Sequence, residues 1–267
     1  MRGRVLIVAG SDSGGGAGIQ ADIKTVTMLD AFAATAITAL TAQNTEGVFG
    51  VLPVPPDFIR RQIEVVLDDI GADAVKTGML HDKTVIETLA AILQERAADV
   101  PLVVDPVMAA KGGARLIEPD AVDALKHLLI PRATVLTPNL PEAEILTGAA
   151  VANVDEMRAA GERLLRLGCR AVLVKGGHLP GETVFDVLVT QAGHRMWESP
   201  RIASRHTHGT GCTLASAIAA GLAQDLDIDT AVDRARAYVQ RAIASAPGLG
   251  RGHGPLDHAH PLRPMHG

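Results

Sequence analysis

The sequence predicts an α/β fold: a three-layer α/β/α sandwich with a mostly parallel central sheet and an antiparallel hairpin at one edge. Short β-branched apolar runs alternate with longer helical patterns, and most of the early runs are apolar throughout, as strands buried on both faces of a parallel sheet are. Alternating strands and helices imply right-handed crossovers with helices on both faces of the sheet. No Pro/Ser-rich linker divides the chain, so we expect a single domain over residues 1–267.

The predicted strands, in chain order, are Val5–Ala9, Ala34–Leu40, Ala74–Lys76, Leu102–Asp105, Val135–Thr137, Ala171–Lys175, Val184–Thr190 and His194–Glu198. The predicted helices are Ile19–Met28, Pro56–Asp68, Lys83–Arg96, Pro119–Leu128, Glu156–Leu167, Thr213–Gln224 and Thr230–Ala246. The last two strands are separated by Gln191-Ala192-Gly193, a connection typical of a hairpin. The tail from Pro247 is rich in Gly, Pro and His, and we expect it to be irregular.

The composition argues against a nucleic-acid partner. The chain has only six aromatic residues in 267: Phe32, Phe49, Phe58, Phe185, Trp197 and Tyr238. That is too few for a surface on which bases stack. The formal net charge of −5 also disfavours binding to a phosphate backbone. We therefore expect a small-molecule substrate.

The chain has no segment typical of membrane insertion or export. No apolar run reaches the roughly 18 residues that a membrane span needs, so we expect no membrane partner. The apolar stretch Val5–Ala9 is shorter than the roughly 7–15 residues of a signal-peptide core, and it is interpreted as a first strand. Two cysteines, Cys169 and Cys212, give no disulfide framework, so the default compartment is the cytoplasm.

A glycine-rich segment, GSDSGGGAGIQAD (10–22), follows the first predicted strand. Glycines let the backbone approach a ligand closely, and the helix that follows offers free N–H groups. A ligand-contacting loop is the favoured interpretation, and a merely tight turn is the alternative. Residues 16–21 also satisfy the dinucleotide pattern G-x-G-x-x-A. The next strand, however, runs into residues 41–44 without the acid that would bind the ribose, which disfavours an NAD(P)-dependent oxidoreductase.

A second motif, HTHGTGCT (206–213), opens an alanine-rich helix. Gly209 and Gly211 allow a tight turn whose N–H groups converge, and a helix N-terminus adds roughly half a positive charge. This arrangement suits a transferring phosphoryl group. Cys212 lies in the first turn of that helix, where a thiol pKa is lowered, so it is a candidate base or nucleophile. The alternative is a small buried cysteine, which is also how we interpret Cys169.

Polar residues follow three of the predicted strands: Lys175 before two glycines, Asp105 before a proline, and Asn139 with Glu142 after a third strand. Carboxylates at one edge of a sheet suit a magnesium–nucleotide site. The alternatives are that Lys175 is a solvated lysine at a strand end and that any one of the other residues is a helix cap. Two H-x-H pairs, 206/208 and 258/260, have no neighbouring cysteines to complete a structural zinc site, so no dedicated metal site is predicted there.

Taken together, these motifs resemble the hydroxymethylpyrimidine and phosphomethylpyrimidine kinases of thiamine biosynthesis, in the ribokinase-like superfamily. The resemblance covers nearly the whole chain, in eight blocks that occur in the same order: AGSDSGGGAGIQADIKT (9–25), ITALTAQNT (37–45), VKTGML (75–80), VVDPVMAAKGG (103–113), LTPNLPEAEILTG (136–148), LVKGGH (173–178), THGTGCTLASAIAAGLA (207–223) and GHGPLDHAH (252–260).

The resemblance implies ATP- and Mg²⁺-dependent phosphorylation of 4-amino-5-hydroxymethyl-2-methylpyrimidine and of its monophosphate, by a homodimer or larger assembly. It assigns the anion hole to Gly209, Thr210, Gly211 and Cys212, with Cys212 as base, ATP contacts to Lys175, Asn139 and Thr207, and magnesium to Asp105 and Glu142. It assigns the pyrimidine site to Asp22, Gln43, Met79 and Val107, with backbone at Gly10 and Ala17.

Two further interpretations share this fold: a pyridoxal kinase, and a non-catalytic nucleotide-binding protein. Lys175 and Cys212 weigh against the second. None of the six aromatic residues falls in a block assigned to the pyrimidine. We therefore expect the substrate ring to be held by aliphatic and polar groups, without stacking on Trp197 or Tyr238.

Overall fold

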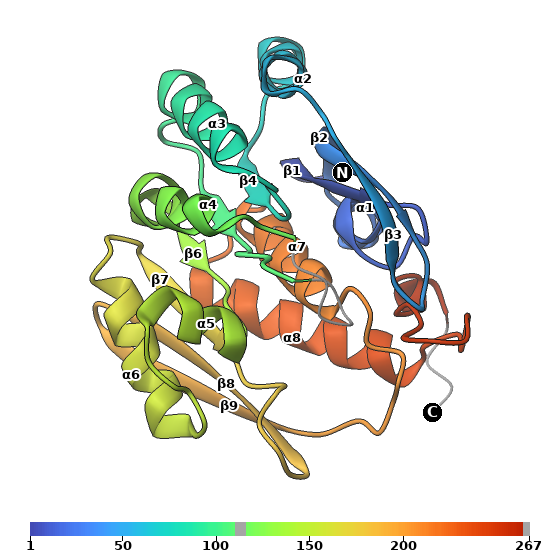
Figure 1. Cartoon of the computed structure of the whole chain (residues 1–267). Helices are drawn as coiled ribbons and strands as arrows, with labels where there is room; N and C mark the ends of the chain where they lie inside the picture. The colour runs from blue at the N-terminus through green and yellow to red at the C-terminus, as the bar shows by residue number, and fades with distance from the viewer. Residues whose placement is uncertain (110–115, 264–267) are drawn as a thin grey trace.

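The computed structural model describes residues 1–109 and 116–263, and it consists of one nine-stranded sheet with helices on both faces (Figure 1). The strand order is β3-β2-β1-β4-β5-β6-β7-β8-β9. The strands are β1 (Arg4–Asp12), β2 (Phe32–Gln43), β3 (Val48–Pro53), β4 (Ala74–Thr77), β5 (Leu102–Val104), β6 (Val135–Leu136), β7 (Ala171–Lys175), β8 (Thr183–Thr190) and β9 (Gly193–Pro200).

The sheet is parallel in its centre and antiparallel at both edges. Strands β2, β1, β4, β5, β6 and β7 are parallel, whereas β3 pairs antiparallel with β2. At the other edge β8 and β9 form the predicted hairpin, which reverses at Gln191 and Ala192. The central strands β4, β5 and β6 are buried along their whole length, which explains their uninterrupted apolar runs.

Helices cover the two faces as separate groups. One face carries α2 (Pro56–Asp69), α3 (Lys83–Arg96), α4 (Pro119–Ala124), α5 (Leu140–Thr147) and α6 (Val154–Leu165), whose apolar residues share one core with the sheet. The opposite face carries α1 (Gly18–Met28), α7 (Thr210–Leu222) and α8 (Ile228–Ala244), which form a second core. The predicted three-layer α/β/α architecture is confirmed.

Each predicted strand is present, but two elements were not expected. Strand β3 is almost wholly exposed, so it has no buried face to give a periodic pattern. Helix α5 has only eight residues and begins three residues after the predicted strand Val135–Thr137, where no helix was predicted. The predicted helix Pro119–Leu128 is α4 followed by a π-helical turn, η1 (Leu125–Leu129), and a 3₁₀ turn, η2 (Ile130–Arg132). A further 3₁₀ turn, η3 (His260–Leu262), lies in the tail.

Candidate active site

A cavity of about 720 Å³ opens at the carboxyl ends of the parallel strands. The strand order reverses at β1, which has β2 on one side and β4 on the other, and ligands of such sheets bind at this point. All but one of the site residues predicted from the sequence line the cavity: Gly10, Ala17, Gln43, Met79, Asp105, Val107, Asn139, Glu142, Lys175, Thr207, Gly209, Thr210, Gly211 and Cys212. The exception is Asp22. Residues 110–113 of the block 103–113 lie outside the described residues.

The turn before α7 needs glycine for both conformation and space. Gly209 has φ +82°, and a Cβ atom there would overlap the carbonyl oxygen of Gly16. Thr210 begins the helix, and its Oγ1 donates to the carbonyl of Thr207 at 2.8 Å. No side chain of the described residues caps α7, so amides of its first turn are available to an anion.

Lys175 stands opposite this turn. A Cβ atom on Gly211 would lie 3.2 Å from Lys175 Nζ and 3.8 Å from Asp105 Oδ2. The ammonium itself lies 3.0 Å from Asp105 Oδ1 and 4.0 Å from Glu142 Oε2. The structure therefore brings together one cation, two carboxylates and a helix N-terminus, as the sequence predicts.

Glu142 has an unusual proton affinity. Its burial raises the pKa to about 7, Asp105 adds to this effect, and Lys175 opposes it. Asn139 and Glu142 also form a capping box at the start of α5, with Asn139 Oδ1 accepting from Glu142 N at 3.0 Å and Glu142 Oε2 accepting from Asn139 N at 2.8 Å. The cap fixes the direction of both side chains at the cavity wall.

Cys212 lies in the first turn of α7, and its thiol is only partly exposed. Burial raises the pKa of this thiol to about 12. The Lys76 ammonium opposes this increase, whereas the carboxylates of Asp22 and Asp105 add to it. The expectation of a lowered pKa is therefore wrong. The thiol is protonated at neutral pH.

Asp22 does not line the cavity, which corrects its predicted place in the pyrimidine site. Its carboxylate is fully buried, with Oδ2 at 2.8 Å from Lys76 Nζ and Oδ1 accepting from Ser216 Oγ at 2.7 Å. The role of Asp22 in this structure is to hold Lys76, which does border the cavity.

Lys76 is a site residue that the sequence reasoning missed. Although its burial opposes a charge, Asp22, Cys212 and Asp105 raise its pKa above the usual range, so the ammonium stays charged. Lys175 was identified as a lysine near the end of a buried strand with a glycine shortly after it. Lys76 shows the same pattern, so the same reasoning could have identified it.

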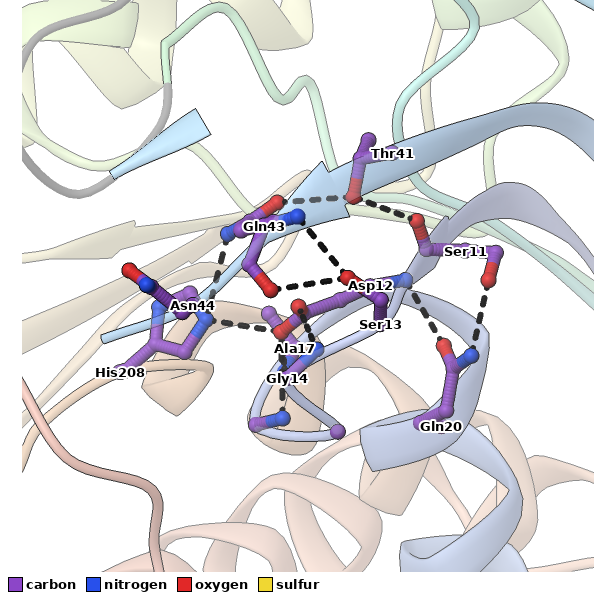
Figure 2. A network of polar contacts seen from close by, with 12 residues as sticks. Ser11, Asp12, Ser13, Gly14, Ala17, Gln20, Thr41, Gln43, Asn44 and His208 are labelled. Atoms are coloured by element: carbon purple, nitrogen blue, oxygen red, sulfur yellow. Dashed lines mark hydrogen bonds and ion pairs between the residues drawn. The ribbon is translucent and has the colours of Figure 1, made fainter. Parts of the chain in front are cut away.

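The same cavity is lined by a second network that the sequence did not predict, centred on Asp12 (Figure 2). Asp12 Oδ2 lies 2.9 Å from His208 Nε2, and Gln43 Nε2 lies 3.4 Å from the same ring nitrogen. The Asp12 carboxylate also accepts from three backbone amides of the glycine-rich loop: those of Gly14 (2.8 Å), Gly16 (3.1 Å) and Ala17 (2.8 Å). These loop amides therefore bind an internal carboxylate, while Gly10 and Ala17 still line the cavity.

The aromatic side chains lie away from the cavity. Trp197 packs under the guanidinium of Arg195 at 4.5 Å and donates from Nε1 to Asp233. Tyr238 donates to the carbonyl of His258 at 2.7 Å. No Phe, Tyr or Trp of residues 1–109 and 116–263 is among the lining residues, where Met79 and Val107 supply apolar surface.

The histidine pairs are engaged with protein groups. His208 contacts Asp12, and His258 Nε2 lies 2.9 Å from Thr213 Oγ1. Within the described parts of the chain, no three residues among His, Cys, Asp and Glu come together as a metal-binding group. In those same parts, no helix combines the length and apolarity needed to cross a membrane.

The comparisons with known proteins agree with this geometry. The sequence profile of the family described as phosphomethylpyrimidine kinase matches residues 12–257. The chain is 47% identical to the hydroxymethylpyrimidine/phosphomethylpyrimidine kinase of Bacillus subtilis, with 96% of this chain and 94% of that protein covered. It is 54% identical, over 96% of its length, to the thiamine biosynthesis bifunctional protein ThiED of Geobacter sulfurreducens, but spans only about half (52%) of that longer protein.

Solved structures of two kinds resemble this fold. A phosphomethylpyrimidine kinase from Clostridium difficile is 43% identical with a TM-score of 0.80, over 90% of this chain and 99% of that one. A Bacillus subtilis pyridoxal kinase in complex with ADP is 37% identical with a TM-score of 0.90, over 97% and 98% of the two chains.

Proposed function

The chain belongs to the phosphomethylpyrimidine kinase family, and we propose which role each of its cavity residues has in phosphoryl transfer. It is an ATP-dependent phosphotransferase that acts on 4-amino-5-hydroxymethyl-2-methylpyrimidine and on its monophosphate. The observation that carries the proposal is the single cavity that joins Lys175, the first turn of α7 and Cys212 to the half-buried amide of Gln43. The Lys175 cluster with the first turn of α7 suits a phosphoryl group, and the Gln43 amide suits the polar edge of a heterocycle.

In phosphoryl transfer the protein mainly positions the reactants and stabilises charge. The amides of residues 209–211 would donate to the equatorial oxygens of the transferred group, and Lys175 would neutralise the same charge. Lys175 lies 3.0 Å from Asp105, so its direction is fixed before a ligand arrives. Thr207 and Asn139, which line the same wall, are proposed to contact the nucleotide.

Asp105 and Glu142 are the proposed magnesium ligands, and their chemistry fits the ion. Mg²⁺ is usually bound by one or two carboxylates together with substrate phosphates and water. When bound, the ion would neutralise charge on the phosphate oxygens. Binding also requires Glu142 to be ionised, and its pKa of about 7 means that a cation competes with a proton at this carboxylate.

Cys212 is proposed to accept the proton of the acceptor hydroxyl. The neighbouring Lys76 ammonium and the Gly18 backbone N–H both favour its thiolate, although burial outweighs them. If the thiolate is the base, the rate of the first transfer rises with pH until the thiol is ionised. The second transfer differs, because an ionised phosphate oxygen has no proton to lose, so it depends less on Cys212.

The proposal is tested by following the phosphorus-containing products of a reaction with ATP, Mg²⁺ and the pyrimidine alcohol by ³¹P NMR. We expect a phosphomonoester to form first and a diphosphate to follow, with one ADP released in each step. Conversion of ATP into ADP and inorganic phosphate alone would contradict the proposal.

A pyridoxal kinase activity is the second candidate. The TM-score of 0.90 to a pyridoxal kinase solved with ADP favours it, and pyridoxal also carries its acceptor hydroxymethyl group on a heteroaromatic ring. The identities of 47% and 43% to two pyrimidine kinases, against 37% to this pyridoxal kinase, favour the pyrimidine as the main substrate.

We also propose that the protein is a homodimer that pairs through the edge strand β3. Phe49 and Leu52 on this strand are 72% and 64% exposed, and an exposed apolar edge strand is prone to pair with another chain. Sedimentation of wild type and of Phe49→Ser/Leu52→Ser tests this: the double variant is expected to sediment as a monomer.

We further propose that the protein is cytoplasmic, because the use of ATP and two free thiols are typical of a cytoplasmic enzyme.

A further inference from the structure

The Asp12–His208–Gln43 network (Figure 2) lines the cavity next to the turn before α7 and has no role in the transfer step described above. Asp12 and His208 are 3% and 7% exposed. Gln43 is half-buried, and its side chain reaches both His208 and Thr41. The hydrogen-bond chemistry of these groups fixes which atom of the Gln43 amide faces which neighbour.

Asp12 decides the protonation of the His208 ring. Although burial opposes its charge, the His208 hydrogen bond and the amides of Ala17 and Gly14 hold the pKa of Asp12 below its usual range. An ionised carboxylate can only accept hydrogen bonds, so the His208 nitrogen that lies 2.9 Å from it carries a proton. Nε2 of His208 therefore carries an N–H that is directed at Asp12, and it has no lone pair with which to accept from Gln43.

Thr41 determines which atom of the Gln43 amide faces its hydroxyl. Its hydroxyl lies 2.9 Å from the carbonyl oxygen of Ser11 and 3.1 Å from the Gln43 side-chain oxygen. The carbonyl can only accept, so it takes the single hydroxyl proton and leaves Thr41 Oγ1 as an acceptor.

A donor on His208 and an acceptor on Thr41 together select one orientation of the amide, with its oxygen toward His208 and its nitrogen toward Thr41. The two ends of a glutamine amide are assigned from such a network. With the opposite orientation, a nitrogen donor would face an N–H and an acceptor would face a hydroxyl whose proton is already used. The amide then has one further N–H and one further lone pair for a ligand, in a fixed order.

We propose that His208, held by Asp12, is a positioning residue that sets the orientation of the Gln43 amide and thereby selects an acceptor with an amino group beside a ring nitrogen. The inference rests on the proposed function, since the aminopyrimidine displays such a donor–acceptor pair. The free oxygen of Gln43 would accept from the amino group, and its free N–H would donate to the ring nitrogen. His208 and Asp12 need not contact the substrate.

The test compares kcat/KM for the aminopyrimidine alcohol with kcat/KM for the same alcohol lacking the amino group. The ratio of the two values, called here the amino preference, does not depend on how much of a variant is folded. His208→Phe retains a ring but removes the N–H, so we expect the amino preference to fall about tenfold, the order of one hydrogen bond. His208→Gln, which can place an N–H near the position of Nε2, is expected to keep the preference within about twofold of wild type.

A double-mutant cycle shows whether His208 acts through Gln43. Gln43→Ala removes the amide, so adding His208→Phe to it is expected to change the amino preference by less than about twofold. Thr41→Val, which removes the partner of the amide nitrogen, is expected to lower the preference in the same direction as His208→Phe. His194→Phe is the matched control, because His194 is exposed on β9 away from the cavity, and it should leave the preference unchanged.

An unchanged amino preference in His208→Phe, or a tenfold fall that persists when Gln43 is already alanine, would overturn the inference. Failure of the proposed function has a different signature, since wild type would then phosphorylate neither pyrimidine.

Discussion

Lys76 and Lys175 occupy similar places in the sequence and contrasting places in the structure. Lys175 is the last residue of β7 and Lys76 the last but one of β4, and each pairs with a carboxylate. Lys76 is fully buried, and its partner Asp22 is completed by Ser216. Lys175 is 12% exposed at its side chain, faces Asp105 and Glu142, and lies beside the first turn of α7. We expect the fully buried pair to contribute mainly to the stability of the fold, whereas the partly open cluster retains capacity for a ligand.

The largest effect is expected at Cys212, whose thiol lies in the electrostatic field of Lys76. Cys212→Ala should lower kcat for the first transfer by about 10²–10⁴-fold, the usual contribution of a positioned base. The rate of ADP release with the pyrimidine alcohol measures this. The control is Cys169→Ala, since Cys169 is buried outside the cavity. A Cys212→Ala rate within about twofold of wild type would refute the assignment of the base.

Lys76→Met should act on stability. It leaves the Asp22 carboxylate buried without its cation, and breaking a buried pair in this way costs about 3–5 kcal/mol of unfolding free energy. Urea unfolding measures the loss. The double variant Lys76→Met/Asp22→Asn should recover part of it, because no buried charge is then left unpaired. A single variant as stable as wild type would break the contrast between the two lysines.

Lys175→Met should act on the reaction instead. Loss of one preorganised group that stabilises the transferring charge lowers kcat by about 10²–10³-fold. Lys175 keeps part of its side chain exposed but pairs with the buried Asp105, so the free energy of unfolding should fall by less than it does in Lys76→Met. The two measurements are made on the same preparation. The contrast fails if Lys175→Met unfolds as readily as Lys76→Met.

His258 extends the comparison to a group that is buried without charge. Burial lowers its pKa to about 4, and its ring contacts Thr213 on α7 at 2.9 Å. As pH falls from about 6.5 to 4, His258 takes up a proton in the unfolded chain but not in the folded one, so stability is lost across this range. The loss is roughly 3 kcal/mol, since each unit of pKa shift is worth about 1.4 kcal/mol. Unfolding of wild type and His258→Gln across this range should show a shallower pH dependence in the variant.

The sequence predicted the layers and the strands of the parallel sheet, because buried strands leave local patterns. The resemblance to the kinase family, together with the glycine motifs and polar strand ends, predicted 14 of the residues that line the cavity. It did not predict β3, whose residues are mostly exposed. It also misplaced Asp22, because the pairing of Asp22 with Lys76 joins residues 54 apart in the chain and depends on how α1 packs on the sheet. The Asp12–His208 contact, which spans 196 residues, has the same origin. The raised pKa of Cys212 arises from burial and neighbouring charges, which the position of a residue in a helix does not reveal.

The central claim is that one cavity transfers phosphate from ATP to a pyrimidine alcohol and to its monophosphate. Steady-state ADP release with the alcohol, the monophosphate and pyridoxal as competing acceptors tests it most directly. The account predicts turnover with both pyrimidines, and a kcat/KM for the alcohol at least about tenfold above that for pyridoxal. A preference for pyridoxal, or no ADP release with either pyrimidine, would contradict it.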